Sequence, residues 1–275
     1  MPEAEHKPLP MSSSNPPVFA PEQRALFVEV LRHLIARQIP FAVSGAFALH
    51  EHTGIWRDTK DLDVFLLHED APRALQVLAE EDFETEVCDP VWLCKARRAD
   101  FFVDLITGMS NAVITVQPGW LERAIPSEVM GVPVKVLAAE ELIASKLFVT
   151  RRERFDGADI VHVIHGTRGK LDWNRILQIV GEHWMMLLWA LVLYQYVYPA
   201  HTQFVPRALW DDLVCRLRNE LDHPDPLAAF RGSLIDEKMF AIDTQEWGMA
   251  NLNEQLRSVR GPVRSVSQNT TKPGS

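Results

Sequence analysis

The sequence predicts an α/β (α+β) fold, in which a mixed sheet flanked by helices is followed by a helical C-terminal region. Up to about residue 137, short apolar runs alternate with segments of helical periodicity. From residue 138 onward, helical periodicity alone recurs. Apolar residues make up 47% of the 275 residues and charged residues 24%, a balance that allows a sizeable core without disulfides or metals.

The first half of the chain alternates between the periods of the two elements. Apolar residues at helical spacing, such as Leu26, Val30 and Leu34, predict an amphipathic helix. Runs rich in β-branched and aromatic residues predict strands. The expected elements are a helix at 21–38, a strand at 41–43, a helix at 46–52, a strand at 62–67, a helix at 72–81, and strands at 83–87, 91–97, 101–106 and 132–136.

The second half predicts helices only, at 139–150, 157–165, 173–181, 183–198 and 207–221. Both ends of the chain are polar and rich in Pro or Ser, a composition typical of disorder. We therefore expect a disordered tail at 1–18, a core at 19–137, a helical region at 138–257 and a second disordered tail at 258–275.

Charge and cysteine content exclude some classes of function. The net charge of −9 disfavours broad, non-specific binding to nucleic acid. The densest basic run, at Arg151, Arg152 and Arg154, is either a solvated helix face or a phosphate-facing patch. Three cysteines without a CxxC pair argue against a disulfide framework and a zinc site. With no secretory signal at the N-terminus, a cytoplasmic location is expected.

One stretch, at 184–198, is almost continuously apolar. It is short for a bilayer span, so the sequence predicts no membrane partner. The stretch is expected to form either a buried core helix or an interfacial or dimer helix.

The chemistry is predicted at Asp61 and Asp63. On a strand, side chains at i and i+2 point to the same face. Two adjacent carboxylates at the edge of an otherwise apolar strand repel each other, and burial penalises their charge. A divalent cation such as Mg²⁺ or Mn²⁺ removes that conflict, because carboxylate oxygens suit these ions.

A third acid, Asp104, lies alone in the apolar run at 101–106. If this strand pairs beside the strand of Asp61 and Asp63, the three carboxylates converge. Such a triad holds metal ions for phosphoryl displacement, and Asp104 acts either as a ligand or as the base for an attacking hydroxyl.

Ser44 and Gly45 lie between a strand and a helix, about 16 residues before the acid pair. N–H groups at a helix N-terminus bind anions, and glycine allows a phosphate to approach the backbone. A turn of this kind is a candidate phosphate site.

A strand, a small Ser/Gly turn, a helix, Asp-x-Asp on a strand and a later strand Asp together resemble the polymerase-beta-type nucleotidyltransferase superfamily. The closer resemblance, over residues 40–165, is to its minimal bacterial branch of antibiotic-type and toxin-type enzymes. It implies a mixed sheet flanked by helices, an NTP as donor, Mg²⁺ on Asp61, Asp63 and Asp104, and a triphosphate at Ser44 and Gly45. The family turn is commonly Gly-Gly or Gly-Ser, and here it is Ser-Gly.

Two lysines are further candidates. Lys60 either meets phosphate or neutralises Asp58. Lys146, followed by Arg residues and the Asp156-x-x-Asp159 pair, resembles the toxin-type segment in which a lysine faces the triphosphate. The two acids either cap the next helix or position Lys146 and Arg151, and capping is the favoured prediction for Asp156.

The resemblance predicts transfer of a nucleoside monophosphate from an NTP to a hydroxyl acceptor. A small molecule such as an antibiotic, a tRNA end and a protein hydroxyl all remain open as the acceptor. The alternative is a nucleotide-binding or toxin–antitoxin partner module with little catalysis. A metal phosphodiesterase is disfavoured, because His-Asp pairs at metal spacing are missing.

Overall fold

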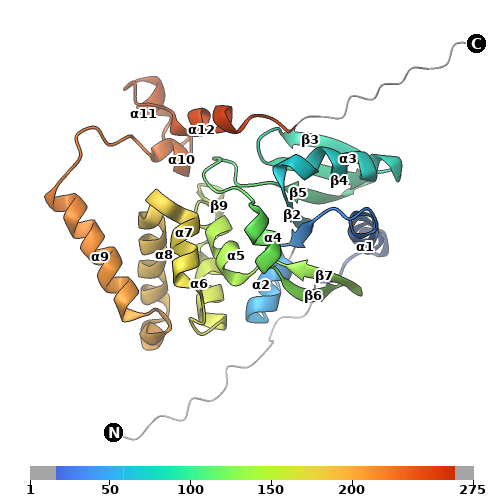
Figure 1. Cartoon of the computed structure of the whole chain (residues 1–275), viewed down its shortest axis with the longest axis horizontal. Coiled ribbons are helices and arrows are strands. Elements are labelled where there is room, and N and C mark those ends of the chain that lie inside the picture. Colours follow the sequence, from blue (N-terminus) through green and yellow to red (C-terminus); the bar gives the residue numbers. More distant parts are fainter. Residues whose placement is uncertain (1–16, 58, 264–275) are drawn as a thin grey trace, which may run out of the picture.

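The computed structural model describes residues 17–57 and 59–263. In this part of the chain a seven-stranded mixed sheet lies on one side and a group of helices on the other (Figure 1). The predicted fold class is therefore confirmed.

The elements have the following bounds. The strands are β1 (Phe41–Val43), β2 (Leu62–Leu66), β3 (Glu84–Asp89), β4 (Leu93–Arg98), β5 (Phe101–Ile106), β6 (Ile125–Val129), β7 (Val132–Val136), β8 (Thr150–Arg151) and β9 (Arg154–Phe155). The α-helices are α1 (Pro21–Ala36), α2 (Gly45–Thr53), α3 (Ala71–Glu80), α4 (Pro118–Arg123), α5 (Ala139–Lys146), α6 (Gly157–Gly166), α7 (Trp173–Val180), α8 (Trp184–Val197), α9 (Arg207–Asp222), α10 (Gly232–Ile235), α11 (Ala241–Gln245) and α12 (Leu252–Arg260).

The strand order of the sheet is β3-β4-β5-β2-β1-β7-β6. Strand β2 lies in the middle, antiparallel to β1 and parallel to β5. The register of the parallel pair sets Asp63 opposite Asp104. Because side chains alternate along strands, Val64 and Leu105 are fully buried on one face while the two acids lie on the other.

Helices α1 and α3 cover the apolar face of the sheet. Helix α1 packs on β5 and β7, and α3 packs on β3 and β4. The predicted stripe on α1 is buried, including Leu26, Val30 and Leu34. Helix α2 contacts β2 and β7 and also packs on α5 and α6, so it joins the sheet to the C-terminal helices.

The helix expected at 139–150 is shorter in the structure. Helix α5 ends at Lys146, and β8 and β9 pair as a small antiparallel hairpin. Two-residue strands are too short to show a period of two, so the sequence did not reveal the hairpin. The six-residue helix α4 and the edge strand β6 were not predicted either.

The expectation of disorder from residue 258 is wrong for the first residues of that segment. Helix α12 continues to Arg260, whose guanidinium donates to Thr107 O at 2.5 Å, and Val263 N donates to Pro90 O at 2.6 Å. These long-range contacts are tertiary and leave no periodic signal. The remainder of that predicted tail, 264–275, and residues 1–16 of the N-terminal one lie outside the described residues.

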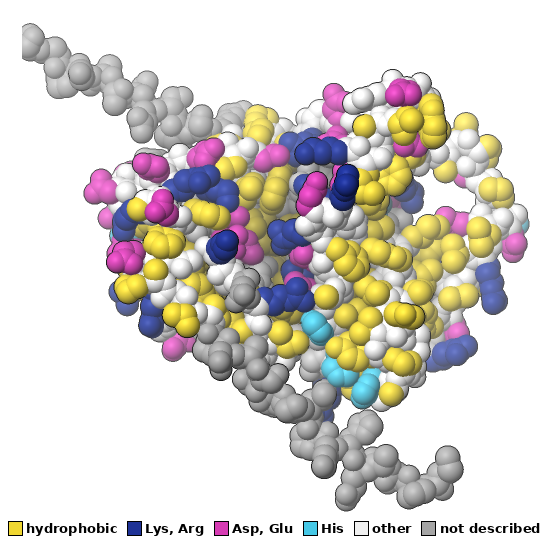
Figure 2. Space-filling model, turned by 180° about the vertical axis from the view of Figure 1, so that it is seen from behind, with side chains coloured by type: hydrophobic (Ala, Val, Ile, Leu, Met, Phe, Trp, Pro, Cys, Tyr) yellow, Lys and Arg dark blue, Asp and Glu magenta, His cyan; other side chains and the backbone are white. Residues whose placement is uncertain are grey.

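The apolar stretch forms α8. Its inner side is buried at Leu187, Leu191 and Tyr194, as expected for a core helix. Its outer side leaves Val192 and Tyr196 exposed, and Figure 2 shows hydrophobic side chains gathered over the half of the molecule that carries the C-terminal helices. Within the described residues, Trp173–Val197 is long and apolar enough to cross a membrane by length and composition, a test that core helices also pass.

Candidate active site

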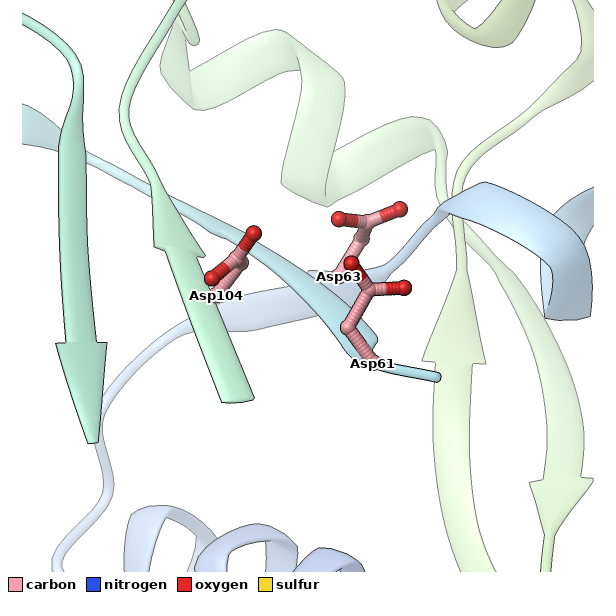
Figure 3. A group of neighbouring side chains, drawn as sticks. All are labelled: Asp61, Asp63 and Asp104. Atoms are coloured by element: carbon pink, nitrogen blue, oxygen red, sulfur yellow. The ribbon is translucent and has the colours of Figure 1, made fainter. Parts of the chain in front are cut away.

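The structure brings Asp61, Asp63 and Asp104 together (Figure 3). Asp61 immediately precedes β2, Asp63 is the second residue of β2, and Asp104 comes from the adjacent β5. Each offers one carboxylate oxygen, and these three oxygens lie within 4.8 Å of one another. We call this group the carboxylate triad.

The electrostatics of the triad show the cost of this arrangement. Burial raises the pKa of Asp63 to about 7, with the charges of Asp61 and Asp104 adding to the shift. Lys146 and Arg154 act in the opposite direction. Burial also raises the pKa of Asp104. Full ionisation of the triad is therefore costly, and a bound divalent cation would relieve that cost.

Gly45 is required by the triad itself. Its φ is +58°, and a Cβ at this position would lie 2.0 Å from Asp63 Oδ2. The sequence suggested that this glycine makes room for a phosphate. In the structure the space beside its Cα is filled by the Asp63 carboxylate, so glycine lets the turn and the acid pair approach each other.

Ser44 occupies the N-cap position of α2 and is only 2% exposed. Its backbone N–H donates to Asp63 O at 2.9 Å, which ties the turn to β2. Its hydroxyl makes no capping hydrogen bond. The first N–H groups of a helix have no partner within the helix, so the hydroxyl and the first turn of α2 supply donors next to the triad.

Lys146 is buried and bound by two acids. Its Nζ lies 2.9 Å from Asp156 Oδ2 and 2.7 Å from Asp159 Oδ2. Arg57 reaches the other oxygen of Asp159 at 2.5 Å. Burial alone would raise the pKa of Asp156, but Lys146 and Arg154 hold it below its usual value.

The favoured prediction that Asp156 caps the next helix is wrong. Asp156 stands at the N-cap of α6 without a side-chain capping bond, because its carboxylate binds Lys146 and Arg154 instead. The alternative, in which these acids position Lys146 and Arg151, agrees with the contacts for Lys146 only. Arg151 donates to the Ser110 hydroxyl instead.

Arg154 belongs to the surroundings of the triad. Its hydrogen bond to Asp156 raises its pKa, and the charges of Asp63 and Asp61 add to that shift. The basic run therefore is not a solvated helix face: Arg151 and Arg154 are paired residues of the β8–β9 hairpin.

Lys60 is exposed in the loop before β2, where its backbone carbonyl accepts from Gln23. Its suggested partner, Asp58, lies outside the described residues. In the same loop the Thr59 hydroxyl donates to Asp61 Oδ1 at 2.9 Å and so orients the first acid of the triad. The spacing of Thr59 and Asp61 did not identify this contact.

Sequence reasoning also missed Lys95 of β4. The register of β4 and β5 sets Lys95 opposite Asp104, and Lys95 Nζ lies 2.5 Å from Asp104 Oδ1. A lysine among alternating polar residues on a strand is typical of a solvent-facing position, and only the strand pairing reveals its partner.

Comparison with known proteins identifies a family for this chain. Residues 23–183, more than half of the chain, match the model of a family described as "Nucleotidyl transferase of unknown function (DUF2204)". No functionally curated protein matches the chain.

Several solved structures are similar to this one. The antibiotic-resistance factor ANT(2'')-Ia is 14% identical, with a TM-score of 0.42 over 64% of this chain and 98% of that one. The lincomycin-bound lincosamide antibiotic adenylyltransferase LnuA is 13% identical, with a TM-score of 0.37 over 54% and 98%. A nucleotidyltransferase-like protein from Paracoccidioides brasiliensis is 18% identical, with a TM-score of 0.43 over 68% and 94%. It is the family match that identifies the chain: it belongs to the nucleotidyl transferases of the DUF2204 family.

Proposed function

We propose that the protein transfers a nucleoside monophosphate from an NTP to a hydroxyl acceptor, with Mg²⁺ or Mn²⁺ held by Asp61, Asp63 and Asp104. The convergence of three carboxylate oxygens within 4.8 Å carries this proposal. The raised pKa of Asp63, about 7, supports it, because burial and the charges of Asp61 and Asp104 make the ionised carboxylate costly in the absence of a metal ion.

The donor set fits a hard divalent cation. All three residues offer carboxylate oxygens, the ligands that Mg²⁺ and Mn²⁺ prefer. When bound, the ion supplies Lewis-acid stabilisation of the charge that develops on the reacting phosphoryl group. The acceptor oxygen attacks the α-phosphorus, its proton passes to a base, and pyrophosphate leaves. Asp104 completes the site as a ligand or as that base.

We assign the triphosphate to the N-terminus of α2. The Ser44 hydroxyl and the N–H groups of the turn that begins at Gly45 are the donors. The exposed side chain of Lys60 is a further phosphate contact in this proposal. Lys146 is held in place by Asp156 and Asp159. It contributes through its positive charge, which also acts to lower the pKa of Asp63.

In this proposal residues 19–137 form the catalytic core and residues 138–257 shape the acceptor site. The acceptor is a hydroxyl of a small molecule, a tRNA end or a protein. The location we propose is the cytoplasm, with which the free thiols of Cys88, Cys94 and Cys215 are in keeping.

Incubation with each labelled NTP, Mg²⁺ and cell extract tests the proposal. We expect one extract fraction to take up label together with release of pyrophosphate. Tight NTP binding without any product would instead support the nucleotide-binding or antitoxin-partner module. Release of phosphate or nucleoside monophosphate without acceptor labelling would support a hydrolase.

A further inference from the structure

One carboxylate of the triad, that of Asp104, already contacts a lysine ammonium group. Lys95 Nζ contacts Asp104 Oδ1 at 2.5 Å, and the two side chains are only 16% and 13% exposed. The pair is thus largely shielded from water, where a charge–charge contact is far stronger than at an open surface.

Lys95 is fixed in this place by its surroundings. The antiparallel register of β4 and β5 sets its backbone directly opposite Asp104. Its ammonium also lies 3.8 Å from the centroid of the Phe102 ring, a cation–π contact two residues along β5. Register, ring and carboxylate together hold the ammonium beside the triad.

The other cations near the triad have different partners. Lys146 binds Asp156 and Asp159, and Arg154 binds Asp156. Among the ion pairs of the described residues, the contact of Lys95 with Asp104 is the one made to a triad carboxylate. Lys95 therefore offsets one negative charge of the triad.

We propose that Lys95 sets the number of metal ions, so that the triad without nucleotide binds one divalent cation instead of two. This rests on the proposed function. Lys95 supplies the positive charge that a second ion, bound through Asp104, would supply in a two-metal site. It is a specificity-determining residue and not a ligand.

The metal count is tested by titrating the EDTA-treated full-length protein with Mn²⁺. Electron paramagnetic resonance of free Mn²⁺ and calorimetry follow the binding. We expect the wild type to bind one equivalent per chain. Lys95→Gln keeps a hydrogen-bond donor for Asp104 but removes the charge, so it should bind two. A wild type that binds two equivalents, or a Lys95→Gln variant that stays at one, would overturn the proposal.

Further variants make the test specific. Arg97→Gln removes a charge from the same strand near the same Phe102 ring, 5.6 Å from its centroid, and should stay at one equivalent. Lys95→Arg keeps the charge and should also stay at one, which covers the case of a poorly folded Lys95→Gln. Adding Asp104→Asn to Lys95→Gln should return the count from two to one.

Asp61→Asn separates the two proposals. If it leaves Mn²⁺ binding unchanged, the proposed metal site itself is wrong. If it abolishes binding while Lys95→Gln stays at one equivalent, only the role of Lys95 is wrong.

Discussion

Asp63 and Gly45 show how single residues shape the site. Burial and two neighbouring acids raise the pKa of Asp63 to about 7, so its ionised form is costly. Gly45 accepts a φ of +58° and has no side chain, so the Asp63 carboxylate lies against its Cα. The Ser44-Gly45 turn and the acid pair are in this way one unit, joined also by the hydrogen bond from the backbone N–H of Ser44 to the carbonyl oxygen of Asp63.

Gly45→Ala should displace Asp63 and weaken Mn²⁺ binding at least about tenfold, because its Cβ would lie 2.0 Å from Asp63 Oδ2. Gly131→Ala is the matched control. Its φ is +86°, but nothing lies within 4 Å of its Cβ, so it tests backbone strain alone, about 1 kcal/mol of stability. Equal Mn²⁺ affinities of the two variants would contradict the steric account.

The raised pKa of Asp63 predicts a pH-dependent stability in EDTA. Between about pH 4, where the unfolded carboxyl ionises, and about pH 7, where the folded one does, the folded state binds the extra proton. Stability should therefore fall as pH rises through this window, by on the order of a few kcal/mol, and level off above it. Urea unfolding of the wild type and of Asp63→Asn gives the free energy of unfolding at each pH. Parallel pH profiles of the two proteins would refute the role of Asp63.

At the scale of elements, the sequence revealed the acids but not all of their partners. The sequence indicated the i and i+2 spacing of Asp61 and Asp63 and the single acid in β5, because charged residues are rare in apolar strands. The three carboxylates converge only because β2 pairs with β5. The sequence did not predict this pairing, which was assumed. Lys95 was missed, because register decides which residues face each other across two strands.

The β8–β9 hairpin explains the wrong prediction for Asp156. It turns the chain back so that Asp156 reaches Lys146, ten residues earlier on α5, and helix periodicity cannot show such a return. The Lys146 cluster with Asp156 and Asp159 thereby joins α5 to α6 behind the triad.

Lys146→Met should destabilise the protein by about 3 kcal/mol, because two largely buried carboxylates lose a shared cation. Lys135→Met, at an exposed position of β7, is the control and should change stability by less than about 0.5 kcal/mol. Urea denaturation measures both, and equal midpoints would show that the cluster is not stabilising.

At the scale of the molecule, the C-terminal helix α12 docks on the sheet. Helices α10–α12 lie along one edge, between α9 and the strands (Figure 1). Arg257 of α12 binds both carboxylate oxygens of Asp89 at 3.0 Å and Ser110 O at 2.6 Å. These contacts span 147 and 168 positions in sequence, so no local sequence pattern reveals them.

Arg257→Ala should cost about 1–2 kcal/mol of stability, because a charged, two-pronged contact between α12 and the sheet is lost. The control, Arg216→Ala, breaks an exposed pair with Asp212 on α9 and should cost less than about 0.5 kcal/mol. Thermal or urea unfolding compares them, and a smaller loss for Arg257→Ala than for Arg216→Ala would contradict the docking role of α12.

The carboxylate triad is proposed to perform metal-dependent nucleotidyl transfer. The most direct test is to measure pyrophosphate release with the NTP and the acceptor that the labelling experiment identifies. Asp63→Asn, compared with Asp100→Asn at an exposed turn, should lose on the order of 100-fold or more in rate while remaining folded. Undiminished release by a folded Asp63→Asn variant would contradict the claim.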